Sequence, residues 1–227
     1  MSKPLIIFGT GSMARVLHSF MRHQYNTVAF CADDEFLADP SMHNFTHDLP
    51  QIPRSALSWK YKPKNHCMAI ACGYHQMNRV RQARFEEFKN AGYEMVGYVN
   101  HLIAPHLGIA LGTGVVIYDG VALHAGSAVR DNAFISSNVS IGHDCVIGDH
   151  AWINSGAVLG GGVWVGARCV LGMNCTIAQH VKLGEGTYVG ANTLVTHDTL
   201  PNSVIVADHG QVIDMNSERF LKLTRQP

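Results

Sequence analysis

His143 and Asp144 are neighbouring residues whose types suit proton transfer. A neutral imidazole accepts a proton from an amine or a hydroxyl group, and an adjacent carboxylate holds the ring in one orientation. The pair stands in the stretch VSIGHDCVIGD, residues 139–149. It predicts a general base with its orienting acid. The alternative is a solvated histidine beside an acid that merely suits a turn.

The pair lies inside a long repeat. From residue 111 to residue 195 every sixth position is Leu, Ile or Val. A short fixed period predicts a solenoid, in which each repeat buries its aliphatic residue by stacking on its neighbours. Gly, Asn or Asp mostly follows three places later, and these residues tolerate the left-handed backbone of a corner. Three hexads per turn predict a triangular prism of about five coils, spaced about 4.8 Å apart.

His143 stands two places after its aliphatic residue. Other occupants of this position are polar, among them Asp119, Gln179 and His197, so we expect it to face outward. Proteins with this kind of solenoid mostly transfer acyl groups from coenzyme A. Such a transfer needs a base for the acceptor and a donor to the oxyanion that forms on the thioester carbonyl.

The first hundred residues follow another pattern. A predicted strand at 5–8 precedes Gly9 and Gly11, a helix continues to about residue 21, and a second strand at 27–31 precedes Asp33. This order is typical of a nucleotide-binding βαβ unit, in which helix N-terminal amides meet phosphate and the acid meets ribose. A third strand at 67–72 leads to Gly73, followed by a helix at 78–90 and a strand at 95–99. The alternative is a tight turn in a domain that binds nothing.

These patterns predict three parts. Residues 1–104 form a small Rossmann-like domain of three or four parallel strands, with a mostly irregular segment at 39–65. Residues 105–207 form the solenoid, and residues 208–227 a tail. In the tail, we expect Ser217 to cap a short helix that packs on the prism or on a neighbouring subunit.

Composition excludes several classes of protein. Lys and Arg total 17, against 17 Asp and Glu, and without a basic stripe we expect no nucleic-acid partner. No apolar run is long enough for a membrane span or a signal peptide, so we expect a cytoplasmic protein without a membrane partner. The six Cys form no CxxC pair, which argues against a disulfide framework.

The segment His143-Asp144-Cys-Val-Ile-Gly, set in this domain order, resembles a bacterial family of nucleotide-sugar acyltransferases. These proteins join a Rossmann-like domain to a left-handed parallel β-helix, and include bacillosamine-pathway N-acetyltransferases and sialic-acid-pathway O-acetyltransferases. The resemblance implies that His143 is the base, that Asp144 orients it, and that the Gly161 amide faces the thioester carbonyl. It also implies that backbone amides of Met173 and Ala191 bind acyl-CoA.

The resemblance further implies a homotrimer, with the cofactor in the groove between adjacent prisms. The nucleotide sugar is assigned to Gly9, Gly11, Asp33 and Gly73, and its acceptor end to Ser136 and Asn138. Trp152 replaces a second family histidine, and we expect it to stack on the sugar or base, or to fill the trimer interface. Ser12, Met13 and Ala14 replace a family Gly-His-Gly, and the closing Gly-x-Pro-Ala of the family is absent near residue 207.

The expected function is N-acylation of a nucleotide-linked amino sugar with acetyl-CoA or another acyl-CoA, without a metal, for surface polysaccharide (O-antigen) or glycan biosynthesis. A sugar O-acetyltransferase would use the same residues. Two other classes are a nicotinamide-dependent oxidoreductase, suggested by Gly9, Gly11 and Asp33, and a zinc hydratase that would need three prism histidines. The sequence does not specify the nucleotide, the sugar or the acyl length.

Overall fold

The computed structural model describes residues 2–38, 49–103 and 108–224. Its N-terminal part is a parallel sheet of five strands in the order β3-β2-β1-β4-β5. The strands are β1 (Leu5–Phe8), β2 (Thr27–Ala32), β3 (Gln51–Pro53), β4 (Cys67–Ile70) and β5 (Glu94–Met95). The helices are α1 (Ser12–Met21), α2 (Asp34–Ala38), α3 (Leu57–Lys60) and α4 (Arg79–Asn90), with 3-10 turns at Arg54–Ala56 and Pro63–Asn65.

The predicted α/β fold is confirmed, with two corrections. The segment expected to be irregular contains β3, two 3-10 turns and α3, so the sheet has a fifth strand. Its strand is only three residues long and ends at a proline, which is too short to show a periodic pattern. The strand expected at 95–99 pairs only at Glu94–Met95, and Val99 instead bridges to Ile117 of the prism.

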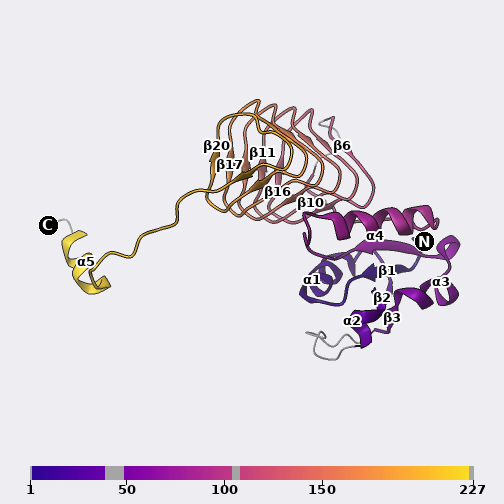
Figure 1. Cartoon of the computed structure of the whole chain (residues 1–227). Coiled ribbons are helices and arrows are strands. Elements are labelled where there is room, and N and C mark those ends of the chain that lie inside the picture. The colour runs from indigo at the N-terminus through magenta and orange to yellow at the C-terminus, as the bar shows by residue number, and fades with distance from the viewer. Residues whose placement is uncertain (1, 39–48, 104–107, 225–227) are drawn as a thin grey trace.

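The hexads form a parallel β-helix, as predicted. Each strand has two residues, and the inner strands pair with strands 18 residues away on each side. The aliphatic residues from Ile117 to Val195 point inward and form one continuous core column, which is why each coil is stable only within the stack. The first of the series, Leu111, is exposed. Figure 1 shows the stacked coils in side view.

The prism has three faces. The covered face contains β7 (Val116–Ile117), β10 (Phe134–Ile135), β13 (Trp152–Ile153), β16 (Val170–Leu171), β19 (Tyr188–Val189) and β21 (Val204–Ile205). The second face contains β8 (Ala122–Leu123), β11 (Ser140–Ile141), β14 (Val158–Leu159), β17 (Thr176–Ile177) and β20 (Leu194–Val195). The third face contains β6 (Ala110–Leu111), β9 (Ala128–Val129), β12 (Val146–Ile147), β15 (Trp164–Val165) and β18 (Lys182–Leu183).

The sheet domain packs against the covered face. Side chains of β1, β4 and α1 share one buried cluster with Val116, Phe134, Trp152 and Val170, which are the outward residues of that face. Helix α4 lies directly beside the prism in Figure 1. The other two faces carry exposed outward residues such as Val158, Trp164 and Leu194.

The tail does not pack on the prism of its own chain, and packing on a neighbouring subunit stays a prediction. Helix α5 (Ser217–Thr224) lies apart from the prism of its own chain in Figure 1. Its N-terminal cap is Asn216, whose Oδ1 accepts a hydrogen bond from the Arg219 amide at 2.8 Å, and not Ser217. The predicted domain boundary at 104–105 lies outside the described residues, as does the segment 39–48.

Candidate functional site

His143 and Asp144 occupy the corner between the second and third faces, here called the His143 corner. The imidazole Nδ1 lies 2.8 Å from Asp144 Oδ2, and the two side chains are 63 % and 70 % exposed. An ionised carboxylate only accepts hydrogen bonds, so Nδ1 is the donor in this pair, and in the neutral imidazole the lone pair lies on Nε2. The arrangement therefore provides an accessible base with an oriented ring.

The neighbouring coils fix the geometry of the pair. Asp144 has φ 57°, the left-handed conformation that Asp tolerates. One coil below, a Cβ added to Gly126 would collide with Asp144 Oδ1, and one coil above, a Cβ added to Gly161 would lie 2.5 Å from His143 Nε2. The two glycines thus leave room for the carboxylate and for the imidazole.

Gly161 places its main chain beside the free nitrogen of His143. In the described parts of the chain, no hydrogen bond occupies the Gly161 N–H, and the same is true of the amides of Met173 and Ala191. All three residues stand two places after their aliphatic residue, at the apex of a corner. Such amides are available to donate to the carbonyl oxygens of a ligand.

Met173 and Ala191 belong to a different corner from His143. They lie between the covered face and the second face, here called the Met173 corner, and both are exposed. Ser136 and Asn138 lie at the same corner on a lower coil, where Ser136 Oγ is 2.8 Å from Ser155 Oγ. The predicted residues are therefore divided between two corners, with the whole second face between them.

The sheet domain is also far from the base in its own chain. It covers the face that lies opposite the His143 corner in a three-sided prism. One chain therefore cannot present a ligand on this domain to its own His143 without crossing the prism.

Gly9, Gly11 and Gly73 meet at the carboxyl edge of the sheet, between β1 and β4. The chain order reverses there, and open α/β sheets bind ligands at such a point. Gly9 has φ 128°, and a Cβ on it would lie 2.7 Å from the Ala71 carbonyl oxygen, so this glycine is needed for packing. Gly11 has open space around it and is the N-cap residue of α1, and main-chain amides at a helix N-terminus suit an anionic ligand.

Asp33 directly follows β2, as expected for a ribose ligand, but its carboxylate is already in two ion pairs. Its Oδ1 lies 2.7 Å from Arg54 Nε and 2.9 Å from an Arg84 guanidinium nitrogen, and the side chain is only 13 % exposed. Two guanidinium groups contact the carboxylate, and binding of ribose by Asp33 stays a prediction. The motif cannot reveal these contacts, because Arg54 comes from the segment expected to be irregular and Arg84 from a helix 51 residues further along the chain.

The prediction that Trp152 faces a ligand or a trimer neighbour is wrong. It is 5 % exposed and stacks on Phe134 with ring centroids 3.9 Å apart, within the contact between the sheet domain and the prism. Its Nε1 donates to Asn154 Oδ1 at 3.0 Å. The tryptophan therefore joins the two parts of one chain and is available neither to a sugar nor to a trimer neighbour.

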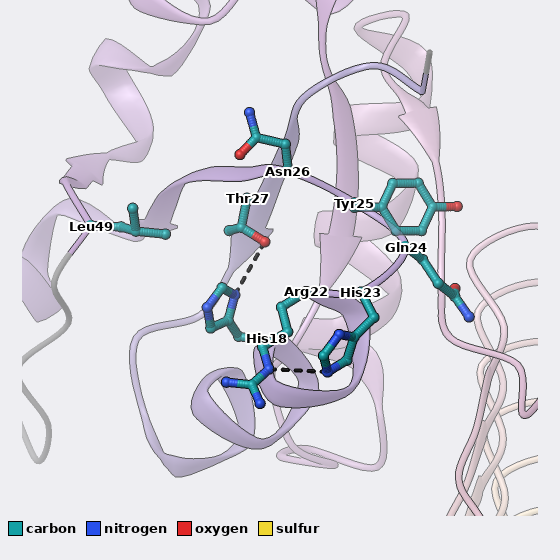
Figure 2. A pocket seen from close by; sticks show the side chains of 8 residues that line it. All are labelled: His18, Arg22, His23, Gln24, Tyr25, Asn26, Thr27 and Leu49. Atoms are coloured by element: carbon teal, nitrogen blue, oxygen red, sulfur yellow. Dashed lines mark hydrogen bonds between the residues drawn. The ribbon is translucent and has the colours of Figure 1, made fainter.

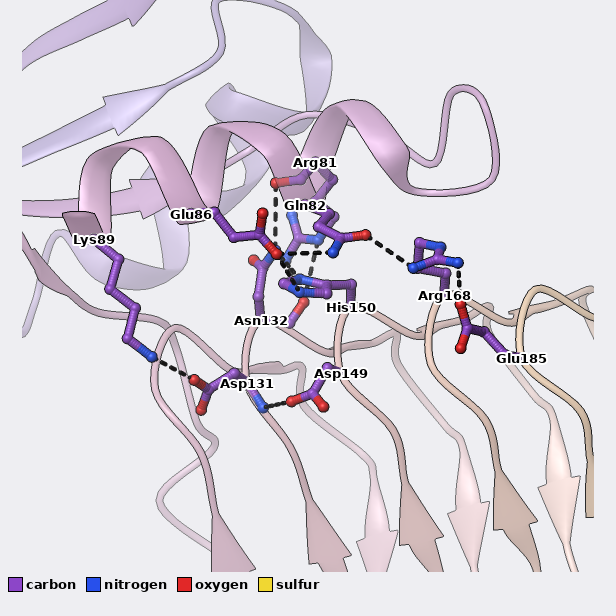
Figure 3. Close-up of polar contacts among 10 residues, drawn as sticks. All are labelled: Arg81, Gln82, Glu86, Lys89, Asp131, Asn132, Asp149, His150, Arg168 and Glu185. Atoms are coloured by element: carbon purple, nitrogen blue, oxygen red, sulfur yellow. Dashed lines mark hydrogen bonds and ion pairs between the residues drawn. The ribbon is translucent and has the colours of Figure 1, made fainter. Parts of the chain in front are cut away.

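Sequence reasoning missed the polar contacts that join α4 to the prism, which Figure 3 shows. Arg81 is fully buried; its guanidinium donates to the carbonyl oxygens of Ile70, Cys72 and Asn132, and lies over the Trp152 ring. Burial lowers its pKa. A surface-like helix of alternating charges gives no signal that one of its arginines is buried.

A strained turn leads into α4. Gln76, Met77 and Asn78 have φ of 52°, 54° and 62°, although none is glycine. Left-handed backbone costs about 1–2 kcal/mol per residue. Asn78 is buried and its Nδ2 donates to the carbonyl oxygens of Arg168 and Cys169 of the prism, which holds the turn in place.

His150 belongs to this contact and is buried, with Asn132 Nδ2 3.0 Å from its Nδ1. Burial lowers its pKa below 6.5, and the nearby Arg81 acts in the same direction, while Asp149, Glu86 and Asp131 act against it. Neutral His150 suits the fold, whereas the unfolded chain binds a proton at about pH 6.5. Stability is therefore full above that pH and falls as the pH drops below it.

We expect the melting temperature to fall between pH 7 and pH 5.5, and the fall to shrink in His150→Asn. Asn keeps the left-handed corner, where His150 has φ 59°, and removes the titration. Differential scanning fluorimetry across this pH range measures it, with exposed His197→Asn as the control. An unchanged pH dependence in His150→Asn contradicts the assignment.

One hollow of the sheet domain lies away from the predicted site residues. It measures about 620 Å³ and is lined by the end of α1 and the start of β2, as Figure 2 shows. Among the described residues, no group of three or more His, Cys, Asp or Glu side chains could hold a metal ion. In the same residues, no helix combines the length and the apolar character needed to cross a membrane.

The comparisons with known proteins agree with this architecture. The family described as GMPPB C-terminal domain matches residues 117–218. A search of curated proteins finds no match. Perosamine N-acetyltransferase from Caulobacter crescentus, a histidine-to-asparagine mutant in complex with CoA and GDP-perosamine, is 26 % identical, with a TM-score of 0.78 over 90 % of this chain and 93 % of that one.

PerB from Caulobacter crescentus, also in complex with CoA and GDP-perosamine, is 28 % identical, with a TM-score of 0.77 over 90 % and 94 % of the two chains. The acetyltransferase domain of PglB from Neisseria gonorrhoeae, in complex with acetyl coenzyme A, shares the fold at 19 % identity, with a TM-score of 0.74 over 91 % and 97 %. The resemblance to bacterial nucleotide-sugar acyltransferases with a hexapeptide-repeat β-helix is thus confirmed, as is the prediction of an enzyme of the sugar N-acetyltransferase kind.

Proposed function

We propose that this chain transfers an acetyl group from acetyl-CoA to the amino group of a nucleotide-linked amino sugar. The observation that carries the proposal is the His143 imidazole, held by Asp144 on one nitrogen and facing the Gly161 main chain with the other. Base and oxyanion donor lie side by side at one corner, where the His143 imidazole is exposed and Gly161 is buried. The neighbours that bind CoA and GDP-perosamine support the two substrate classes.

The chemistry follows from these positions. His143 Nε2 accepts a proton as the sugar nitrogen attacks the thioester carbonyl carbon. The oxyanion of the tetrahedral intermediate accepts a hydrogen bond from the Gly161 N–H. When the C–S bond breaks, the CoA sulfur leaves as a thiolate and takes the proton from the imidazolium. Asp144 stabilises the charged ring and stays ionised throughout.

Two copies of the chain complete the site. The His143 corner of one copy carries the base and the oxyanion donor, while the Met173 corner of a second copy supplies free amides for acyl-CoA together with Ser136 and Asn138. The second copy's sheet domain covers the face next to that corner. A contact between two different corners is head-to-tail, and three prisms joined by such contacts form a closed ring.

We expect a homotrimer, of about three times the 24.8 kDa chain mass. Multi-angle light scattering on the purified protein at micromolar concentration measures this mass. A monomer that retains full activity contradicts the shared site, because no single chain brings the two corners together.

The reaction product tests the function itself. Incubation with acetyl-CoA and a panel of UDP-, dTDP- and GDP-linked amino sugars should yield, for one member, a product heavier by one acetyl group and one equivalent of free CoA thiol. Mass spectrometry detects the product, and resistance to mild hydroxylamine identifies an amide. A hydroxylamine-labile product would instead show an ester and an O-acetyltransferase. Absence of turnover with every nucleotide sugar contradicts the proposal.

A further inference from the structure

Tyr74 connects the carboxyl edge of the sheet to the prism. It follows Gly73 directly after β4, so it stands at the edge where Gly9 and Gly11 also lie. Its ring is 42 % exposed, and its centroid lies 5.4 Å from that of Trp152. Trp152 in turn stacks on Phe134. Three aromatic rings thus lead from the prism contact outward to the nucleotide side of the sheet.

The position of Tyr74 is held by its surroundings. The left-handed residues Gln76, Met77 and Asn78 follow it, and the Asn78 amide donates back to the Tyr74 carbonyl oxygen at 3.3 Å. Asn78 is anchored on the prism, while buried Arg81 holds the carbonyl oxygens just before Gly73. Strained backbone that the surroundings over-determine is found most often at ligand sites.

We propose that Tyr74 is the residue that stacks on the hexose ring of the nucleotide sugar. The inference rests on the proposed function. A pyranose ring has an apolar face of C–H groups, and an exposed aromatic ring offers it a flat surface with little entropy to lose. Tyr74 lies between the glycine turn and Trp152. The glycine turn suits the diphosphate, and Trp152 Nε1 donates a hydrogen bond to Asn154 at the Met173 corner. The sugar would extend from the glycine turn past Tyr74 toward the Met173 corner, where the His143 base of the second copy lies.

The test compares Tyr74→Ala with Tyr74→Phe. We expect Tyr74→Ala to weaken binding of the accepted nucleotide sugar about tenfold, with binding of the matching nucleoside diphosphate and of acetyl-CoA unchanged. Tyr74→Phe should stay near wild type, because it keeps the ring. Isothermal titration calorimetry measures all three ligands. Trp59→Ala is the control, since Trp59 is a highly exposed aromatic of the same domain, on α3.

Three outcomes overturn the inference. Equal weakening for the nucleoside diphosphate would place Tyr74 on the base or the phosphates. Unchanged affinity for the nucleotide sugar in Tyr74→Ala would remove it from the site. Failure of the wild-type protein to bind any nucleotide sugar would overturn the proposed function as well. The wild-type measurement therefore distinguishes a failure of the Tyr74 inference from a failure of the proposed function.

Discussion

Replacing His143 with alanine is expected to lower kcat by about 10²–10⁴-fold, the usual contribution of a positioned general base. The imidazole is exposed on a corner and the prism core does not depend on it, so the melting temperature should change little. Affinity for acetyl-CoA should also persist, because main-chain amides are proposed to hold that ligand. Steady-state kinetics with the accepted nucleotide sugar measure the effect.

His197→Ala is the matched control. His197 occupies the same position of its hexad, is exposed, and forms a hydrogen bond with the neighbouring Thr196 Oγ1 at 2.8 Å. His150 is unsuitable, because it is buried between α4 and the prism. A His143→Ala variant within about threefold of wild type would show that the amine loses its proton to water and that the protein acts by positioning alone.

Asp144→Asn separates orientation of the ring from the base itself. Asn tolerates the left-handed corner and keeps a group beside Nδ1, but it removes the charge that stabilises the imidazolium. A smaller loss of kcat than in His143→Ala is therefore consistent with an orienting role.

The prism was predictable because its rules are local. One aliphatic residue every six positions defines the core, and a residue suited to a left-handed corner follows three places later. The corner position also admits residues that the pattern does not favour, since Arg168 and His180 adopt φ of 57° and 62°. There the stacking of adjacent coils overrides the preference of the single residue.

The relation between the parts was not predictable, because it depends on contacts between distant segments. Nothing in the hexads distinguishes the face that receives the sheet domain from the two faces that stay exposed. Trp152 resembles an outward residue in the pattern and becomes buried only because the sheet domain packs over it. Asp33 resembles a ribose ligand and is occupied by Arg54 and Arg84.

Mixed trimers offer the sharpest test of the two-copy site. His143→Ala removes the base from one corner, and Ala191→Trp is expected to block the acyl-CoA groove at the other, since Ala191 is exposed. Each variant alone should be nearly inactive. When the two variants are coexpressed, the Ala191→Trp chain keeps an intact His143 corner and the His143→Ala chain keeps an intact Met173 corner. An interface between these two intact corners is active. Every head-to-tail ring that contains both variants has one such interface, about a third of its sites.

We therefore expect tandem-affinity-purified mixed trimers to recover about a third of wild-type activity, measured as CoA release. The matched control combines His143→Ala with Gly161→Val, whose side chain would occupy the space of the imidazole. Both changes lie on the same corner, so every interface lacks either the His143 imidazole or the room that this imidazole needs. No recovery is expected. Recovery in this control would show that His143 and Gly161 act from different copies, and no recovery in the first mixture would show that the site lies within one chain. Recovery in the first mixture alone would assign the base and the acyl-CoA amides to different copies, as the separation of the two corners requires.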